Sequence, residues 1–297
     1  MSNIITPSKL KELCTEFNLK PSKSYGQHYL ISDVPIKKMI EAGELTKDDT
    51  IIEIGPGFGV LTLALAPLVK KVIAFEIEQR LKPYWGEKQK EYPNIDIIWG
   101  NALNEFISYN LSPVTPYKVL ANLPYQITSD AIRMLLETVP APEKIIFMVQ
   151  KEVAERICAK PPDMSMLSVA VQYYGKAKIV AKVPAGAFWP APKVDSAVIM
   201  ITPEHPSTRA PEHSSTQAPE HLGTREHDEQ FFRVVRAGFS QKRKQLWHNL
   251  SGGLQIPAEK VKSGLKEVCG NEKVRAEELS VEEWRYIVRD LHSNIVT

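Results

Sequence analysis

The chain has 297 residues, 43% of them hydrophobic and 24% charged, which is the composition of a globular protein with one large and one smaller domain. The formal net charge of +2 is uninformative by itself, and the lack of any apolar run approaching ~18 residues excludes a membrane-spanning segment. The cysteines Cys14, Cys158 and Cys269 show no zinc-type or paired spacing, and the N-terminus lacks an apolar secretion signal. We therefore expect a soluble, cytoplasmic protein without a metal site.

Two short helices are predicted at the N-terminal end, separated by a polar loop. Leu10, Leu13 and Phe17 recur with helical spacing within residues 7–20, and Asp33 with Pro35 predicts the start of a second helix over 33–43. The loop between them, residues 23–29, contains aromatic side chains and a glycine.

The first core strand is predicted at residues 50–54, which are mostly β-branched. It leads into Gly55-Pro-Gly57-Phe-Gly59 and an apolar helical stretch over 60–68. Strand, glycine-rich turn and helix are typical of a nucleotide-type site, because glycines let the backbone approach a ligand closely. The spacing GxGxG lacks the last glycine of the dinucleotide fingerprint, so it disfavours a nicotinamide-dependent oxidoreductase and favours a cofactor without a pyrophosphate.

Polar residues follow the next two predicted strands, 71–75 and 95–99. Glu76 ends the first and can accept hydrogen bonds from both hydroxyls of a ribose, and Asn101 follows the second. The carboxyl ends of parallel strands share one edge of a sheet, so these residues and Gly57 predict an adenosine-binding site. The alternative for Glu76 is a surface glutamate that merely ends a strand.

The fourth predicted strand, 117–121, ends in Asn122-Leu123-Pro124-Tyr125. The Asn122 side-chain oxygen and the Leu123 carbonyl, whose direction Pro124 restricts, can both accept hydrogen bonds from one amino group. Tyr125 offers a ring on which a base can stack, an interaction worth about 1 to 3 kcal/mol. The alternative is a turn that ends the strand, since Asn and Pro are ordinary turn residues.

The rest of the α/β region predicts an antiparallel edge to a mainly parallel sheet. The expected elements are helix 129–138, strand 144–149, helices 150–156 and 164–174, and strands 178–183 and 196–201. Between the last two strands, Phe188 and Trp189 lie among prolines. This loop suits a second stacking wall opposite Tyr125, or else a rigid connector.

Residues 203–226 are three copies of an eight-residue unit with almost no apolar side chains, which predicts a flexible linker. The histidines of the repeat, His205, His213 and His221, suit only weak metal binding. Beyond it, helices are predicted around Phe232 to Leu250, with Ser240 as an internal N-cap, and over 257–268 and 281–291.

Basic residues without acidic neighbours gather in two places, residues 175–194 and 233–248. Such local excess suits a phosphate backbone, and the alternative is two solvated faces.

These motifs carry a family resemblance. Glu53 to Thr62, with Glu76 behind it, resembles the S-adenosylmethionine site of class I methyltransferases, and Asn122 to Tyr125 narrows this to enzymes that methylate an exocyclic amino group. Further motifs are similar to the ribosomal RNA adenine dimethyltransferase family, most closely its small-subunit rRNA dimethyladenosine transferases: Lys23 to Gln27, Phe188 to Asp195 and Phe239 to Leu246. The likeness covers nearly the whole chain except the repeats.

The resemblance implies an α/β, Rossmann-like class I methyltransferase fold, mostly parallel with an antiparallel edge, plus a small all-helical domain. Residues 1–202 would form the S-adenosylmethionine-dependent domain, 203–226 the linker and 227–297 a helical RNA-binding domain.

The activity implied is transfer of methyl groups from S-adenosyl-L-methionine to N6 of two adjacent adenosines in the 3'-terminal hairpin of small-subunit rRNA, in ribosome biogenesis. The implied partner is that rRNA or the assembling small subunit, and we expect a monomer. One alternative is an enzyme of the same family that modifies large-subunit rRNA and confers macrolide resistance. Another is a non-catalytic ribosome assembly or transcription factor. The intact Asn122 motif disfavours this alternative. Asn101 leaves it open, because the family usually has an acid at that position.

The resemblance also assigns roles to single residues, and no metal ligand is among them. The catalytic group would be Asn122, Leu123, Pro124, Tyr125 and Phe188. The cofactor would contact Gln27, His28, Tyr29, Gly55, Gly57, Glu76, Asn101 and Asn122. The rRNA would contact Lys193, Arg236, Lys242, Arg243 and Lys244.

Overall fold

The computed structural model describes residues 5–20, 28–109, 116–204 and 225–293. The chain divides into two compact units, which we describe separately. The first comprises Met1–Glu155 and Ala177–Pro203, and the second comprises Arg156–Lys176 and Glu204–Thr297. Residues 205–224, which hold the three repeat histidines, and Gln27 lie outside the described residues.

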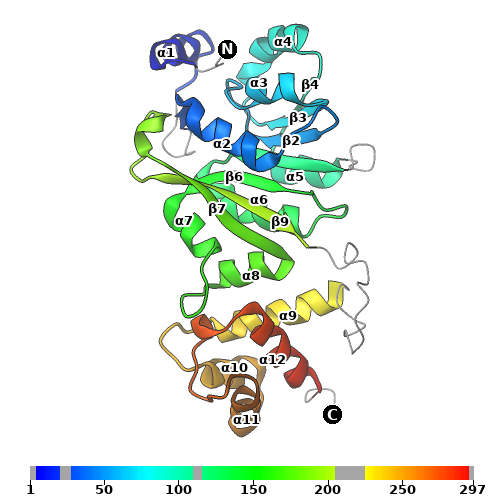
Figure 1. Ribbon diagram of the computed structural model, residues 1–297, viewed down its shortest axis with the longest axis vertical. Coiled ribbons are helices and arrows are strands. Elements are labelled where there is room, and N and C mark those ends of the chain that lie inside the picture. The colour runs from blue at the N-terminus through cyan, green and yellow to red at the C-terminus, as the bar shows by residue number, and fades with distance from the viewer. Residues whose placement is uncertain (1–4, 21–27, 110–115, 205–224, 294–297) are drawn as a thin grey trace. The chain divides into compact units, whose positions relative to one another are not determined.

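A seven-stranded sheet forms the centre of the first unit, with the order β4-β3-β2-β5-β6-β9-β7 (Figure 1). Its strands are β2 (Thr50–Ile54), β3 (Lys71–Glu76), β4 (Ile95–Trp99), β5 (Tyr117–Asn122), β6 (Ile145–Gln150), β7 (Gly175–Val183) and β9 (Ser196–Pro203). Strands β2 to β6 pair in parallel, and β9 pairs antiparallel with β6. The predicted fold class, including its antiparallel strand, is confirmed.

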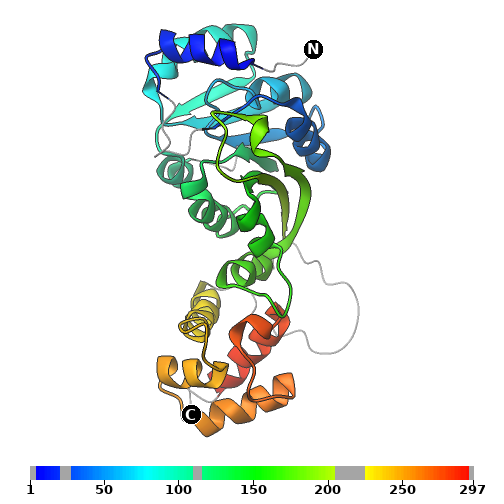
Figure 2. The same cartoon turned by 90° about the vertical axis from the view of Figure 1, so that its left-hand side faces the viewer.

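Helices cover both faces of this sheet (Figures 1 and 2). They are α1 (Pro7–Glu16), α2 (Asp33–Gly43), α3 (Thr62–Leu65), α4 (Lys82–Glu91), α5 (Ala102–Ser108), α6 (Thr128–Leu136) and α7 (Lys151–Ile157). Ile51, Val72 and Leu120 share one apolar core with α1 to α4. Phe75 points to the opposite face, where its ring lies 5.9 Å from that of Phe106 in α5. Because side chains alternate along a strand, Glu53, Glu76 and Asn122 all belong to the face of α1 to α4.

A second, two-stranded sheet joins segments that are far apart in the chain. In β1 (Tyr29–Leu30) and β8 (Phe188–Trp189), Tyr29 pairs with Trp189 and Leu30 with Phe188 in antiparallel register. The proline-rich loop is therefore fastened to the N-terminal loop.

The second unit is helical, with α8 (Met166–Tyr174), α9 (Arg225–Gly238), α10 (Leu246–Leu254), α11 (Ala258–Cys269) and α12 (Val281–Ser293). Val169 and Tyr173 of α8 pack in one core with Phe231, Leu250 and Trp284. This packing places residues 156–176 with the helical unit, whereas the sequence assigned them to the first domain.

The predicted N-cap at Ser240 is wrong. Helix α10 begins at Leu246, with Gln245 as the residue before it. Residues 239–245 form a turn instead, because the buried amide of Asn249 donates to the carbonyls of Gly238 (2.6 Å) and Gln241 (3.1 Å).

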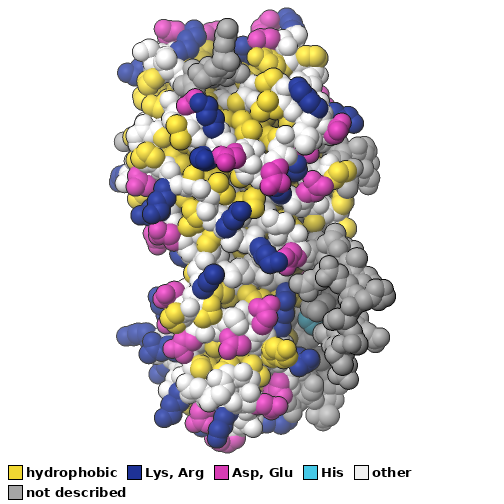
Figure 3. Space-filling model, viewed as in Figure 1, with side chains coloured by type: hydrophobic (Ala, Val, Ile, Leu, Met, Phe, Trp, Pro, Cys, Tyr) yellow, Lys and Arg dark blue, Asp and Glu magenta, His cyan; other side chains and the backbone are white. Residues whose placement is uncertain are grey.

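Charged side chains of both signs are mixed over the visible face of each unit (Figure 3). Among the helices that the structure describes, none is long and apolar enough to cross a membrane.

Candidate functional site

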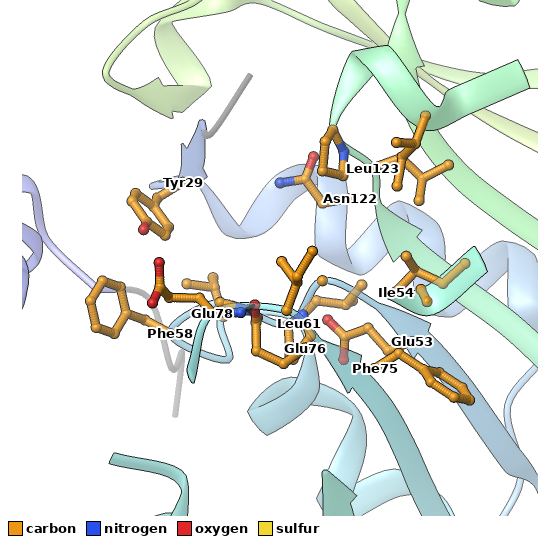
Figure 4. Close-up of a pocket in the computed structure, with 18 of the residues that line it drawn as sticks. Tyr29, Glu53, Ile54, Phe58, Leu61, Phe75, Glu76, Glu78, Asn122 and Leu123 are labelled. Atoms are coloured by element: carbon orange, nitrogen blue, oxygen red, sulfur yellow. Dashed lines mark hydrogen bonds between the residues drawn. The ribbon is translucent and has the colours of Figure 1, made fainter. Parts of the chain in front are cut away.

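A cavity of about 780 Å³ lies in the first unit, at the carboxyl ends of β2, β3, β4 and β5 (Figure 4). This is the edge at which open α/β sheets bind ligands. All the described residues predicted to contact a cofactor line it: His28, Tyr29, Gly55, Gly57, Glu76, Asn101 and Asn122. Leu123, Pro124 and Tyr125 line it as well.

The glycine turn after β2 forms part of the cavity wall. Gly57 has φ +55°, which L side chains rarely adopt, and a Cβ there would lie 3.3 Å from Cε1 of Tyr29. Two side chains of α4 hold the turn from outside: Trp85 Nε1 donates to the Gly57 carbonyl (3.1 Å) and the Tyr84 hydroxyl donates to the Phe58 carbonyl (2.8 Å). These supports were not predicted from the sequence.

Glu76, at the end of β3, is almost fully buried and well bonded. One carboxyl oxygen accepts from the Gly57 amide (2.9 Å), and the other accepts from the Glu78 amide (2.7 Å). Burial raises the pKa of Glu76, and these backbone hydrogen bonds oppose that rise. Ile77 contributes a further backbone hydrogen bond, and because a carboxylate has about four acceptor sites, Glu76 can still accept a hydrogen bond from a ligand.

Glu53, on β2, is a further buried acid in the cavity lining, with 2% of its surface exposed. Its Oε2 atom has no hydrogen-bond partner among the described residues. Burial raises the pKa of Glu53 to about 8, the charge of Glu76 adds to this rise, and the Thr62 hydroxyl opposes it. Glu53 begins the motif that resembles an S-adenosylmethionine site, but no role was predicted for this residue itself, although a charge inside an otherwise apolar strand is a signal of one.

The segment after β5 presents acceptors beside this cavity. The Asn122 side-chain amide donates to the His28 carbonyl (3.2 Å), and no described residue donates to its Oδ1. The Tyr125 hydroxyl bonds to Ser196 Oγ (2.8 Å), which fixes the ring, and the His28 ring lies 5.8 Å from it. His28 Nδ1 in turn lies 2.7 Å from the Pro190 carbonyl. Asn122 is thus held by His28 of the N-terminal loop, and Tyr125 is held by Ser196 at the start of β9.

Phe188 does not reach the cavity. Its side chain is 3% exposed and packs in the core of the first unit, because β8 pairs with β1 and turns this residue inward. The structure therefore does not place Phe188 opposite Tyr125 as a stacking wall.

Asn101 lies at the cavity edge and also caps a helix. Its Oδ1 accepts from the Leu103 amide (3.1 Å) at the start of α5, so part of its hydrogen-bonding capacity is already used.

The basic residues expected to contact RNA are all solvent-exposed: Lys193 in the first unit, and Arg236, Lys242, Arg243 and Lys244 in the second. The last three lie on the turn that Asn249 shapes. Within the described ranges, no group of three or more His, Cys, Asp or Glu side chains is arranged to hold a metal ion.

Comparison with known proteins shows which family the chain belongs to. The ribosomal RNA adenine dimethylase family matches residues 18–292. Ribosomal RNA small subunit methyltransferase A of Dehalococcoides mccartyi is 40% identical over 287 residues, which cover 97% of this chain and 94% of that protein.

Two solved structures share the fold of nearly the whole chain. A dimethyladenosine transferase from Plasmodium falciparum has a TM-score of 0.71 at 25% identity and covers 90% of this chain and 98% of its own. The 23S rRNA methyltransferase ErmE has a TM-score of 0.66 at 24% identity and covers 89% of this chain and 99% of its own. At this identity the likeness shows only that the fold is shared. Together with the family match, these likenesses confirm the predicted resemblance, and the chain belongs to the ribosomal RNA adenine dimethylase family.

Proposed function

We propose that this protein is a methyltransferase that uses S-adenosyl-L-methionine to dimethylate N6 of two adjacent adenosines in the 3'-terminal hairpin of small-subunit rRNA. The observation that carries the proposal is the hydrogen bonding of the Asn122 side chain. Its side-chain amide nitrogen donates one hydrogen bond to the His28 carbonyl, which leaves Oδ1 as an acceptor beside the Leu123 carbonyl, at the edge of the cavity.

The cavity residues fit this cofactor. S-adenosylmethionine has a flat adenine ring, a ribose, a sulfonium and a zwitterionic methionine end, with a net positive charge, and the cavity combines apolar walls with the buried acids Glu53 and Glu76. Gly57 leaves a space against Tyr29 that a Cβ would fill. We assign Glu76 to the ribose hydroxyls, Asn101 to the adenine, and His28, Tyr29 and the Gly55 to Gly57 turn to the methionine part. The same assignment for Gln27 concerns a residue outside the described ranges.

The reaction requires a more nucleophilic adenine N6. The lone pair of this amino group is delocalised into the ring, and the bound cofactor supplies an electrophilic methyl group on a sulfonium. Asn122 Oδ1 and the Leu123 carbonyl accept both amino hydrogens, which favours a tetrahedral nitrogen and stabilises its positive charge during transfer. Tyr125 holds the base by stacking, since a base must leave its helix to react. After each transfer the methylated nitrogen loses one proton to solvent, so no general base with a shifted pKa is needed.

The similarity to the small subunit methyltransferase A relative supports small-subunit rRNA as the substrate. We propose that Lys193, Arg236, Lys242, Arg243 and Lys244 contact its phosphates, because all are exposed and the last four lie in a stretch without acidic residues. We also propose that the enzyme acts as a monomer on an assembling small subunit.

The test is methyl transfer from labelled S-adenosylmethionine to small subunits that lack the modification, with unmodified large-subunit RNA alongside. We expect label in N6,N6-dimethyladenosine of the small subunit only. Label in the large-subunit RNA would assign the enzyme to the other branch of the family. No label in either RNA, together with a loss of cofactor binding, would favour a non-catalytic assembly factor.

A further inference from the structure

Glu53 is the cavity acid for which the proposed reaction has no use. Its carboxyl group points towards Leu61 and Glu76 within the cavity lining (Figure 4). Oε2 is buried and lacks a hydrogen-bond partner in the described chain, and the polar group beside the carboxyl group is the hydroxyl of Thr62. Burial makes an ionised carboxylate costly here, and the Thr62 hydroxyl offsets only part of that cost.

The charged groups around Glu53 do not compensate for a negative charge. On the neighbouring strand β3, the facing group is the acid Glu76, and α3 contributes the neutral Thr62. On β5, Lys118 is already bonded to Asp49 (2.9 Å). The other ionisable side chains that line the cavity are His28, Tyr29, Glu78, Arg80 and Tyr125.

Arg80 is the cation in this lining that pairs with another acid. It makes a two-point contact with Glu78, Nε to Oε1 at 2.8 Å and Nη2 to Oε2 at 2.6 Å. The cavity is therefore set up to receive positive charge from a ligand.

We propose that Glu53 carries a proton in the cofactor-free protein and releases it when the cationic cofactor binds. The O–H bond of the carboxyl group breaks, its electron pair stays on the carboxylate, and the proton goes to the buffer. The cofactor contributes an ammonium and a sulfonium, and an opposite charge within about 4 to 6 Å favours the ionised form of an acid. This inference rests on the cofactor assigned under the proposed function.

Glu53 is the better source of the proton than Glu76. Both acids are buried, but Glu76 accepts backbone hydrogen bonds at both oxygens, which stabilise its ionised form. Oε2 of Glu53 has no such donor. The two residues thus differ in hydrogen bonding rather than in burial.

Isothermal titration calorimetry of S-adenosylmethionine tests the proposal in the absence of RNA, so that no turnover occurs. The titration is run at about pH 6.5 in two buffers of different ionisation enthalpy, because the difference in heat counts the protons exchanged. At this pH the α-amino group of the cofactor, with a pKa of roughly 7.7 to 8.0, is already charged and contributes little.

We expect the wild type to release about one proton per bound cofactor. Its dissociation constant for S-adenosylmethionine should therefore fall about tenfold for each unit that the pH rises between about pH 6 and 7. Glu53→Gln should bind without proton release and with little pH dependence. Glu78→Gln is the matched control, since Glu78 lines the same cavity but is paired with Arg80, and it should release the proton as the wild type does.

Binding without proton release, or equal release by wild type and Glu53→Gln, would overturn the inference and leave the proposed function standing. A complete lack of binding by the wild type would overturn the proposed function and the inference with it. Should Glu53→Gln fail to fold, infrared difference spectroscopy of the wild type gives the answer: a protonated-carboxyl band that disappears on cofactor binding supports the proposal, and no change refutes it.

Discussion

Asn122→Ala separates the catalytic role of the Asn122 amide from its structural role. The substitution removes the hydrogen bond to the His28 carbonyl, which is worth about 1 kcal/mol and about 2 to 4 °C in melting temperature. It also removes the acceptor Oδ1, and loss of one preorganised transition-state hydrogen bond costs about 10²- to 10³-fold in kcat. We therefore expect a folded protein that binds S-adenosylmethionine normally and transfers methyl groups at least a hundredfold more slowly in a single-turnover assay.

Asn94→Ala is the matched control for this substitution. The Asn94 side-chain amide donates to the Ala66 carbonyl (2.8 Å) and the Val69 carbonyl (3.3 Å), and Asn94 does not line the cavity. It should lower the melting temperature to a similar extent and leave methyl transfer close to the wild-type rate. An Asn122→Ala enzyme within about threefold of the wild type would refute our reasoning, and so would an equal loss of rate in both variants.

Three further predictions concern the cavity and the basic turn. Gly57→Ala should weaken cofactor binding, measured by calorimetry, because a left-handed backbone costs an alanine about 1 to 2 kcal/mol and its Cβ would meet Tyr29 at 3.3 Å. Arg243→Gln and Lys244→Gln should each reduce the slope of log affinity for rRNA against log salt by about 0.7 to 0.9, and an unchanged slope would make them a solvated face. Glu53→Gln should change the pH dependence of stability in the cofactor-free protein. The pKa of Glu53 is 4.5 in the unfolded chain and about 8 in the folded protein. Between these pH values, folded Glu53 holds a proton that the unfolded chain has lost. The free energy of unfolding of the wild type therefore falls as pH rises, by at most about 1.4 kcal/mol per pH unit. Thermal melts from pH 5 to 8 should show that this fall is absent from the variant.

The parallel strands and the edge that carries the site were predictable from the sequence. Runs such as Thr50–Ile54 and Lys71–Glu76 are β-branched or apolar and end in glycine or a polar residue, so both the strand and its carboxyl end are visible locally. Once three such strands are parallel, Gly57, Glu76 and Asn122 must share one edge. The cavity they line follows from this order.

The supports of the site were not predictable because they depend on contacts between distant segments. Helix α4 is rich in Lys and Glu, and nothing local shows that Tyr84 and Trp85 bind carbonyls of the glycine turn. The β1–β8 pair is only two residues long on each side, and it buries Phe188, which a proline-rich loop would otherwise expose. Both the α4 contacts to the glycine turn and the burial of Phe188 result from packing between distant segments rather than from a local sequence pattern.

The two buried acids show how one turn sets the chemistry of the cavity. Glu53 pairs with Ala74 in the β2–β3 register, so Glu76 lies two residues further along the next strand and on the same face. The turn aims the Gly57 amide at Glu76, and it gives no donor to Oε2 of Glu53. Because the left-handed backbone of Gly57 directs that amide, a change at Gly57 alters the ionisation of Glu76 as well as the space for the ligand. The glycine turn thus gives one acid a hydrogen bond that favours its ionised form, and it gives none to Oε2 of the other.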